Sequence, residues 1–238
     1  MANTPASKAV LDGTYHPPAD SDRATTELFS EIASIRRIVL KDSASPVISP
    51  EQWMQYLAAM NEETLSSESG LHFGHYIVGS KSDIVAHYHA ARVLVVLAHA
   101  IQLERWSRKL SVMLEKTLGV TLVSKLRAIL LMEADFNASN KILYGVRMMQ
   151  NARAYQFMPE EIYSEKNQMA DDGTLTKTLF YDVTRQARIP ATIASVDASN
   201  CYDRIAHAMA SLVFQAFGVP ASAVGSMLSA IKNMKFFL

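Results

Sequence analysis

The amino-acid sequence predicts a mainly helical α+β chain of 238 residues. Apolar residues recur every three or four positions along most of its length, the spacing of helices packed on a core. Only three places read as β-structure: short apolar runs on either side of Gly119, an apolar, β-branched run at residues 191–197, and the last residues, 236–238. Hydrophobic residues make up 49% and charged residues 19%, which is a globular composition, and the length allows a substantial core.

We expect three segments along the chain. Residues 1–21 are polar, contain prolines and lack the apolar stretch of a signal peptide, so they predict a flexible arm. Residues 22–65 predict a helical extension, and residues 66–238 hold the hairpin and the remaining elements. The only cysteine, Cys201, excludes an internal disulfide and indicates an intracellular protein.

Two helices are expected in the extension. The first begins at Asp22, because apolar side chains follow it at helical spacing. Ser49, Pro50 and Gln52 match an N-cap, a first-turn proline and a capping box, which predicts a second helix to about Met60. The apolar side chains of the first helix are Leu28, Ile32, Ile35 and Val39.

A polar loop over residues 61–70 precedes a long helix over residues 82–103. Arg92 and three histidines interrupt its apolar window, so we expect a buried helix rather than a membrane span, and no membrane partner. A zinc site needs three or four converging ligands, and no cysteine pair supplies them. We therefore interpret the paired histidines as structural: His72, His75, His87 and His89.

The predicted hairpin joins residues 111–116 to residues 125–132 through a turn at Gly119, and helical spacing resumes over residues 136–155. Lys plus Arg and Asp plus Glu both number 23, and this zero net charge argues against a chain that binds nucleic acid over its whole surface. A local basic surface is nevertheless expected around the hairpin. It would comprise Arg105, Arg108, Lys109, Lys116, Lys125 and Arg127.

The last third continues with alternating elements. Asp172 or Thr174 is expected to cap a helix that ends at Arg188, after which a predicted strand leads to Asp197. A further helix is predicted over residues 205–217, with Gly218 as its stop signal and another helix from Pro220. The final residues are apolar and strand-like, whereas a complete domain usually ends on exposed polar residues. We therefore expect a piece of a longer protein, ending at Phe236, Phe237 and Leu238.

The most informative stretch is residues 191–207, where an apolar run ends on Asp197 and a loop with Tyr202 and Asp203 leads into a helix. A carboxylate at the end of a buried strand is costly unless a cation compensates it, and magnesium with a phosphate chain is one such compensator. Two plainer interpretations stay open. Asp197 can cap the next loop without a metal, and Tyr202 can be a half-buried aromatic with a hydrated hydroxyl.

This stretch resembles the first palm motif of reverse transcriptases, which reads Asp, four residues, an aromatic, often Asp, then an aliphatic. The matching positions are Asp197, Tyr202, Asp203 and Ile205. Three other blocks precede it in the family's order. Residues 67–76 resemble the Ser-Gly-x-His-x-Gly-His-Tyr segment before the fingers, and residues 114–129 resemble the fingers hairpin, with Ala128 in place of a usual proline. Glu-Ala-Asp-Phe-Asn at residues 133–137, with Lys141, resembles the element that follows.

Residues 66–238 therefore resemble the fingers and first palm segment of a reverse transcriptase of the non-long-terminal-repeat retroelement type. The resemblance implies a partial right-hand polymerase fold, RNA-directed DNA polymerase activity, Mg²⁺, a template-primer of RNA or DNA, and deoxynucleoside triphosphates. It makes Asp197 the first metal ligand and sets Tyr202 against the sugar of the nucleotide. Arg127 falls on the arginine that grips the triphosphate, with Lys125 beside it. Arg127 can also be read as an ordinary surface arginine.

One departure bears on catalysis. The family's second carboxylate motif, Tyr-x-Asp-Asp, is missing, because no acidic residue follows Asp203. The Asp171-Asp172 pair lies before Asp197, so it reads as a loop and N-cap unless the palm is permuted. We expect a catalytically incomplete reverse transcriptase fragment. The alternative is a non-catalytic helical module, derived from a retroelement, that binds nucleic acid or another partner.

Overall fold

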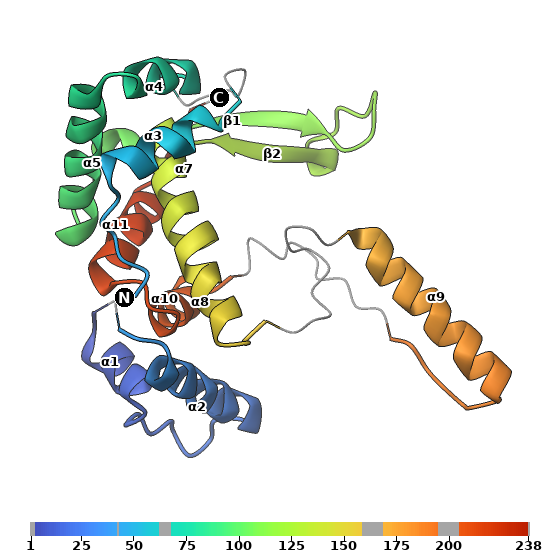
Figure 1. Ribbon diagram of the computed structural model, residues 1–238. Coiled ribbons are helices and arrows are strands. Elements are labelled where there is room, and N and C mark those ends of the chain that lie inside the picture. The colour runs from blue at the N-terminus through green and yellow to red at the C-terminus, as the bar shows by residue number, and fades with distance from the viewer. Residues whose placement is uncertain (1–2, 42, 62–67, 159–168, 195–204, 238) are drawn as a thin grey trace. The chain divides into compact units, whose positions relative to one another are not determined.

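The computed structural model describes residues 3–41, 43–61, 68–158, 169–194 and 205–237. They divide into two compact units (Figure 1). The first unit joins Met1–Asn151 to Ala206–Leu238, and the second is Ala152–Ile205. The described part is mainly helical with one small sheet, which confirms the predicted fold class at the level of a mainly helical α+β chain.

The first unit opens with a helix where a flexible arm was expected. Helix α1 spans Pro5–Asp12, and the Thr4 side chain caps it by accepting from the backbone N–H of Ser7. Val10 and Leu11 are buried against α2 and α10. Residues 5–12 are therefore helical where an arm was expected, because burial of Val10 and Leu11 stabilises this helix of eight residues.

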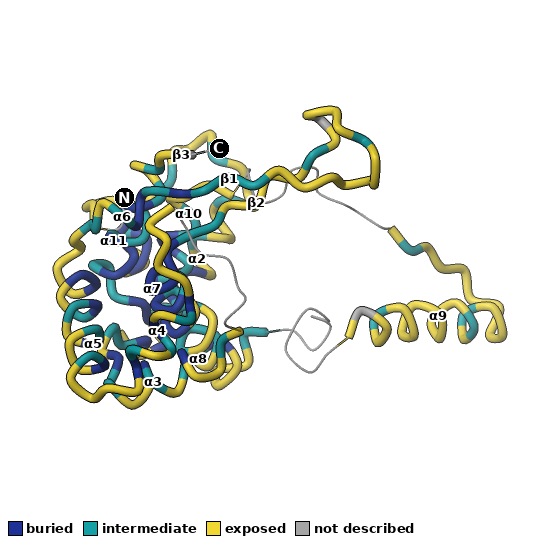
Figure 2. The backbone as a smooth tube through the Cα atoms, turned by 90° about the horizontal axis from the view of Figure 1, so that it is seen from above, coloured by how far each residue is buried: buried dark blue, intermediate teal, exposed yellow. Residues whose placement is uncertain are grey.

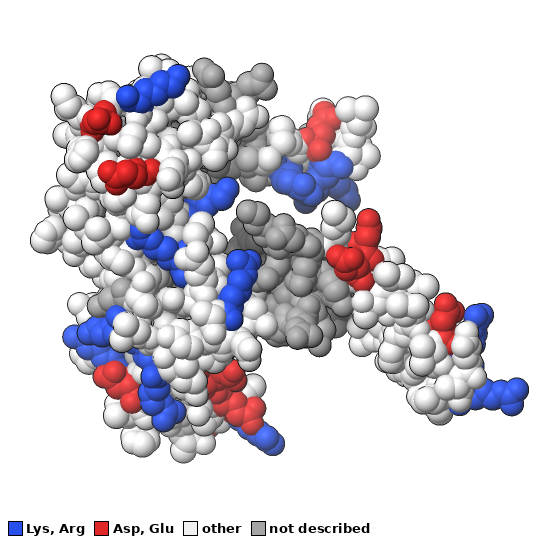
Figure 3. Space-filling model, viewed as in Figure 1, with Lys and Arg blue, Asp and Glu red and all other residues white. Residues whose placement is uncertain are grey.

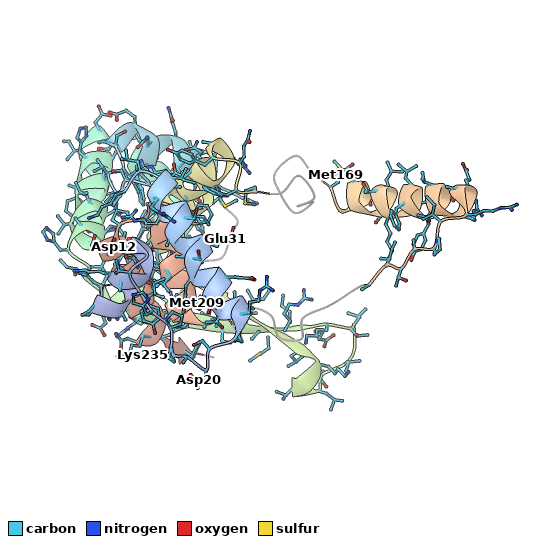
Figure 4. The ribbon with its side chains drawn as sticks, turned by 90° about the horizontal axis from the view of Figure 1, so that it is seen from below. Asp12, Asp20, Glu31, Met169, Met209 and Lys235 are labelled. Carbon is cyan, nitrogen blue, oxygen red and sulfur yellow. The ribbon has the colours of Figure 1, made fainter. Side chains whose placement is uncertain are left out.

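Helices α2 (Arg23–Ile38) and α3 (Pro50–Ala58) confirm the two helices expected in the extension. The Asp22 carboxylate accepts from the Thr25 N–H at 2.8 Å, and the Ser49–Gln52 capping box is complete. Helices α1 and α2 pack with α10 (His207–Ala216) around a small cluster, and Met209 lies at this contact (Figure 4).

The main core gathers side chains from six helical elements. Helix α4 (Phe73–Ser80) was not predicted, whereas α5 (Asp83–Ala98) confirms the expected long helix and ends earlier than expected. The short α6 (Glu104–Ser107) follows α5, and α11 (Ala221–Lys232) packs against α5. The largest side chains of the core are Trp53, Leu57, Phe73, Tyr76, Val93, Leu97 and Leu143.

The predicted hairpin is confirmed. Strand β1 (Arg108–Glu115) pairs antiparallel with β2 (Leu126–Leu131), and a short 3₁₀ turn, η1 (Val123–Lys125), precedes β2. The C-terminal strand is β3 (Lys235–Phe237), which pairs parallel to β1, so the strand order is β2-β1-β3.

One continuous helical stretch follows the hairpin, as predicted. It comprises α7 (Ala134–Asn140), the π-helical η2 (Lys141–Met148) and α8 (Met149–Ala154). Gly218 terminates α10 with a φ of 89°, a conformation that glycine adopts without strain, so the stop signal is confirmed. Pro220 is the N-cap residue of α11.

The second unit contains α9 (Ala170–Ala187), preceded by Met169 as its N-cap (Figure 4). Asp172 stands in the first turn, where its carboxylate accepts from the Met169 N–H at 2.8 Å, and Arg188 ends the helix with a φ of 54°. Residues 191–194 are irregular and lie mostly at the surface. A buried strand is therefore wrong for these four residues, and residues 195–197 lie outside the described part.

Buried residues concentrate in the helices of the first unit, whereas the outer half of the hairpin and most of α9 are exposed (Figure 2). Across the described ranges, no helix has the length and apolarity needed to cross a membrane.

Candidate nucleic-acid interface and a buried ionic cluster

Two of the four predicted site residues lie in the described part of the chain. Lys125 ends the 3₁₀ turn before β2, and Arg127 is the second residue of β2. Asp197 and Tyr202 lie outside the described residues, and so do Cys201 and Asp203 of the same motif. The structure therefore brings together the two cationic candidates and leaves the predicted metal ligand untested.

The exposed cations of the hairpin lie at its outer half. The Lys116 N–H donates to the carbonyl of Lys125 at 3.2 Å, which puts these two residues opposite each other. Arg127 faces Leu114 in the ladder. All three basic side chains are exposed, and blue side chains gather on this part of the hairpin in Figure 3.

The carboxylate of Glu115 is hydrogen-bonded within the turn of the hairpin. Glu115 Oε2 accepts from the Gly119 N–H at 2.7 Å, and Gly119 has a φ of 82°. The carboxylate thus fixes the turn by a hydrogen bond to a backbone N–H. Exposed aliphatic side chains complete the tip, with Leu118 97% and Val123 82% exposed. The hairpin end therefore offers cations and apolar surface together.

The wider basic surface predicted around the hairpin is wrong for two of its six members, and a third is partly exposed but paired with carboxylates. Arg108 pairs with Glu68 and Glu104 at 3.3 Å each. Lys109 is fully buried, and Arg105 is bonded to two buried carboxylates. These residues are neighbours in sequence, but Lys109 lies in the interior, whereas the outer half of β1 is exposed.

A buried ionic cluster lies at the base of the hairpin. Glu133 and Asp135 have no exposed surface. Asp135 Oδ2 accepts from Arg92 Nη2 at 2.8 Å and from Arg105 Nη2, while its Oδ1 accepts from Trp106 Nε1 at 3.0 Å. Each carboxylate oxygen of Asp135 therefore has at least one hydrogen-bond donor, which offsets the cost of burying the charge.

Arg105 connects Asp135 to two other groups. Its Nη1 donates to Glu133 Oε2 at 3.3 Å and to the hydroxyl of Tyr76 at 3.0 Å. Burial, reinforced by Asp135, raises the pKa of Tyr76, so the phenol stays protonated. Tyr76 belongs to the block at residues 67–76 and Glu133 to the block at residues 133–137, so two of the resembling blocks meet here.

Lys109 is the least satisfied member of the cluster. Its Nζ lies 4.4 Å from the ring centroid of Phe136, and among the described residues no hydrogen-bond acceptor reaches it. Burial lowers the pKa of Lys109 to about 8, against the opposing attraction of Glu133 and Asp135. The amine is therefore close to neutral in mildly alkaline solution.

The histidines make structural contacts. His89 is half-buried among the rings of Trp53, Tyr76 and Tyr88, and its Nδ1 lies 3.2 Å from Arg92 Nη2. Burial, followed by the charge of Arg92, lowers the pKa of His89. Within the described ranges, no three His, Cys, Asp or Glu side chains converge as a metal site would require. Asp197, the predicted Mg²⁺ ligand, lies outside these ranges, so the described residues do not test the predicted Mg²⁺ site.

Comparisons with protein families, with curated proteins and with solved structures find no match for this chain. Sequence reasoning gave Glu133 and Asp135 no chemical role. The available signal was two carboxylates directly after an apolar strand, together with Arg92 inside an apolar helix.

Proposed function

We propose that this chain is the fingers and first palm segment of an RNA-directed DNA polymerase of the retroelement reverse transcriptase type. Its nucleic-acid interface would be the outer half of hairpin β1–β2. The observation that carries the proposal is the hairpin itself, with Lys116, Lys125 and Arg127 exposed together at its outer half and a helix bearing Asp135 and Asn137 directly after it.

The chemistry of the three side chains suits phosphate. Lysine supplies a compact charge, and the arginine guanidinium can donate two parallel hydrogen bonds to one phosphate group. Exposed aliphatic side chains beside them can cover a sugar or the edge of a base. The hairpin has no aromatic residue between Arg108 and Met132, so sequence-tolerant stacking is not part of the proposed contact.

The remaining roles come from the resemblance and belong to the same proposal. Asp197 would hold Mg²⁺, which offsets the charge of a triphosphate when bound, and Tyr202 would face the nucleotide sugar. Arg127 would contact the triphosphate of the incoming nucleotide, with Lys125 as its neighbour.

Salt dependence of binding tests the interface. The full chain should bind single-stranded RNA weakly and without sequence preference. If all three cations contact phosphates, log K should fall with log salt at a slope of about −2, so affinity drops about 20-fold from 50 to 200 mM. Fluorescence anisotropy with a labelled oligonucleotide measures this slope.

Lys125→Glu with Arg127→Glu should make the slope shallower, from about −2 to about −0.7, because at most one phosphate contact remains. The matched control is Lys8→Glu with Lys41→Glu, which changes the net charge equally at exposed positions in α1 and after α2. Equal loss of binding in the two double variants would show a general charge effect and refute the hairpin interface.

A further inference from the structure

The buried ionic cluster closes the base of the hairpin. The last pair in the β1–β2 ladder is Leu110 with Leu131. Beyond it, Arg105 precedes β1 and Glu133 follows β2, and their side chains form an ion pair at 3.3 Å. Asp135, two residues further on, also binds Arg105. The cluster thus continues the connection between the two strands after their backbone pairing ends.

The same cluster attaches the hairpin to the helices. Arg92 reaches Asp135 from α5, and Tyr76 reaches Arg105 from α4. Trp106 donates to Asp135 and packs on Phe136 of α7, with ring centroids 5.0 Å apart. Asp135 is therefore bonded to Arg92 of α5 and to Arg105 and Trp106 of α6, and Arg105 in turn bonds to Glu133 after β2.

Support for the hairpin declines along its length. Lys109, near the base, is fully buried, whereas Met113 and Leu114 are about half exposed and Leu118 at the tip is 97% exposed. In Figures 1 and 2 the outer half of the two strands extends away from the helices of the same unit. The direction of such a projection is set where it is anchored.

We propose that Asp135 is a positioning residue, which fixes the direction of hairpin β1–β2 on the helices by holding Arg92, Arg105 and Trp106. A consequence is that Asp135 also places Lys125 and Arg127, and this consequence alone rests on the proposed function. This role involves both the block at residues 67–76 and the block at residues 133–137, because Arg105 donates to Tyr76 of the first and to Asp135 of the second.

The carboxylate is specifically required by this geometry. Asp135 Oδ2 accepts from two guanidinium groups at once, and a negatively charged carboxylate oxygen makes stronger hydrogen bonds to cations than a neutral amide oxygen does. In Asp135→Asn the shape is kept, but the cluster of three cations, Arg92, Arg105 and Lys109, then has Glu133 as its remaining carboxylate. The guanidinium groups should then separate and release the base of the hairpin.

Spin-label distances test the direction of the hairpin in the full chain. In a Cys201→Ser background, Ala128→Cys labels the exposed β2 ladder and Ile84→Cys labels α5, where Ile84 is 83% exposed. The parent should give one narrow distance distribution. Asp135→Asn should broaden or shift it, while the pair Leu40→Cys and Ile84→Cys, both outside the hairpin, should be unchanged.

Glu27→Gln is the matched control, because it removes the charge of an exposed carboxylate paired with Arg23. It should leave both distance distributions as in the parent. An unchanged hairpin distance in folded Asp135→Asn would overturn the proposal. If circular dichroism shows that Asp135→Asn does not fold, Arg105→Lys takes its place. It keeps the charge but loses the two-pronged contact, and the same two distance outcomes apply.

Nucleic-acid binding separates the two proposals. Asp135→Asn should weaken RNA binding several-fold while the salt slope stays at the parent value, because the phosphate-binding cations are all present. Charge reversal at Lys125 and Arg127 should instead make the salt dependence shallower. A parent chain that binds no RNA would refute the proposed function, and the distance measurement would still decide the role of Asp135.

Discussion

Replacing Lys109 with methionine should stabilise the protein at neutral pH. The Lys109 amine is fully buried beside Phe136, and none of the described residues offers it a hydrogen-bond acceptor. Burial lowers its pKa from 10.5 to about 8. That difference corresponds to about 3 kcal/mol of unfavourable free energy for keeping the charged amine in the folded chain at pH 7.

The sign of the pH dependence follows from the two pKa values. Between pH 8 and pH 10.5 the unfolded chain binds more protons at Lys109 than the folded chain does, so the free energy of unfolding rises with pH. Below pH 8 both states are protonated and the full cost applies. Lys109→Met lacks this dependence, and methionine has a similar volume and flexibility. The advantage of the variant should be largest at pH 7 and shrink above pH 8.

Urea denaturation at pH 7, 8, 9 and 9.5 measures the difference between the two proteins. The fluorescence of Trp53 and Trp106 reports unfolding, because both side chains are fully buried. The comparison stops at pH 9.5 since burial raises the pKa of Tyr56 to about 12, and this tyrosine lowers stability in both proteins above pH 10. The reasoning would be refuted if the variant were less stable than the parent at pH 7. It would also be refuted if the difference in free energy of unfolding between the two proteins were the same at every pH.

Three further results are expected. Leu11→Ala should lower the free energy of unfolding by about 3 kcal/mol, measured in urea, whereas a flexible arm would give no change. Gly218→Ala should lower the melting temperature more than Gly119→Ala: both glycines have positive φ, but only at Gly218 would a Cβ collide with Ser43. A similar loss in both variants would contradict this. The 238-residue chain should not extend a primer with Mg²⁺, because no carboxylate follows Asp203, and any lengthened product on a gel would count against this.

The elements that sequence predicted well carry local signals. Helices α2 and α3 have capping side chains at Asp22 and Ser49, and both caps are formed in the structure. The hairpin has two apolar runs and a glycine between them, and Gly119 adopts the positive φ that such a turn uses. These features depend on residues a few positions apart, so they can be read from the chain alone.

The elements that sequence missed depend on distant partners. Helix α1 has Thr4 and Pro5 at its start and Gly13 at its end, but the surface that buries Val10 and Leu11 comes from α2 and from α10, which lies near the other end of the chain. At residues 191–194 the opposite occurred, because β-branched residues predicted a strand that finds no pairing partner in the described part. A strand needs a neighbour, and local propensity does not supply one.

The buried ionic cluster shows the same limit for charge. Arg92 and Asp135 are 43 positions apart, and Arg105 and Asp135 are 30 apart, so no local pattern pairs them. Read singly, each charge belongs on a surface. Their burial is explained only when the five charges are considered together. Three cations and two carboxylates leave one excess positive charge, and Lys109 is the cation whose pKa is lowered by burial. The unpaired amine is thus the cost of a cluster whose other members anchor the hairpin, which is why its removal should add stability while removal of Asp135 should release the strands.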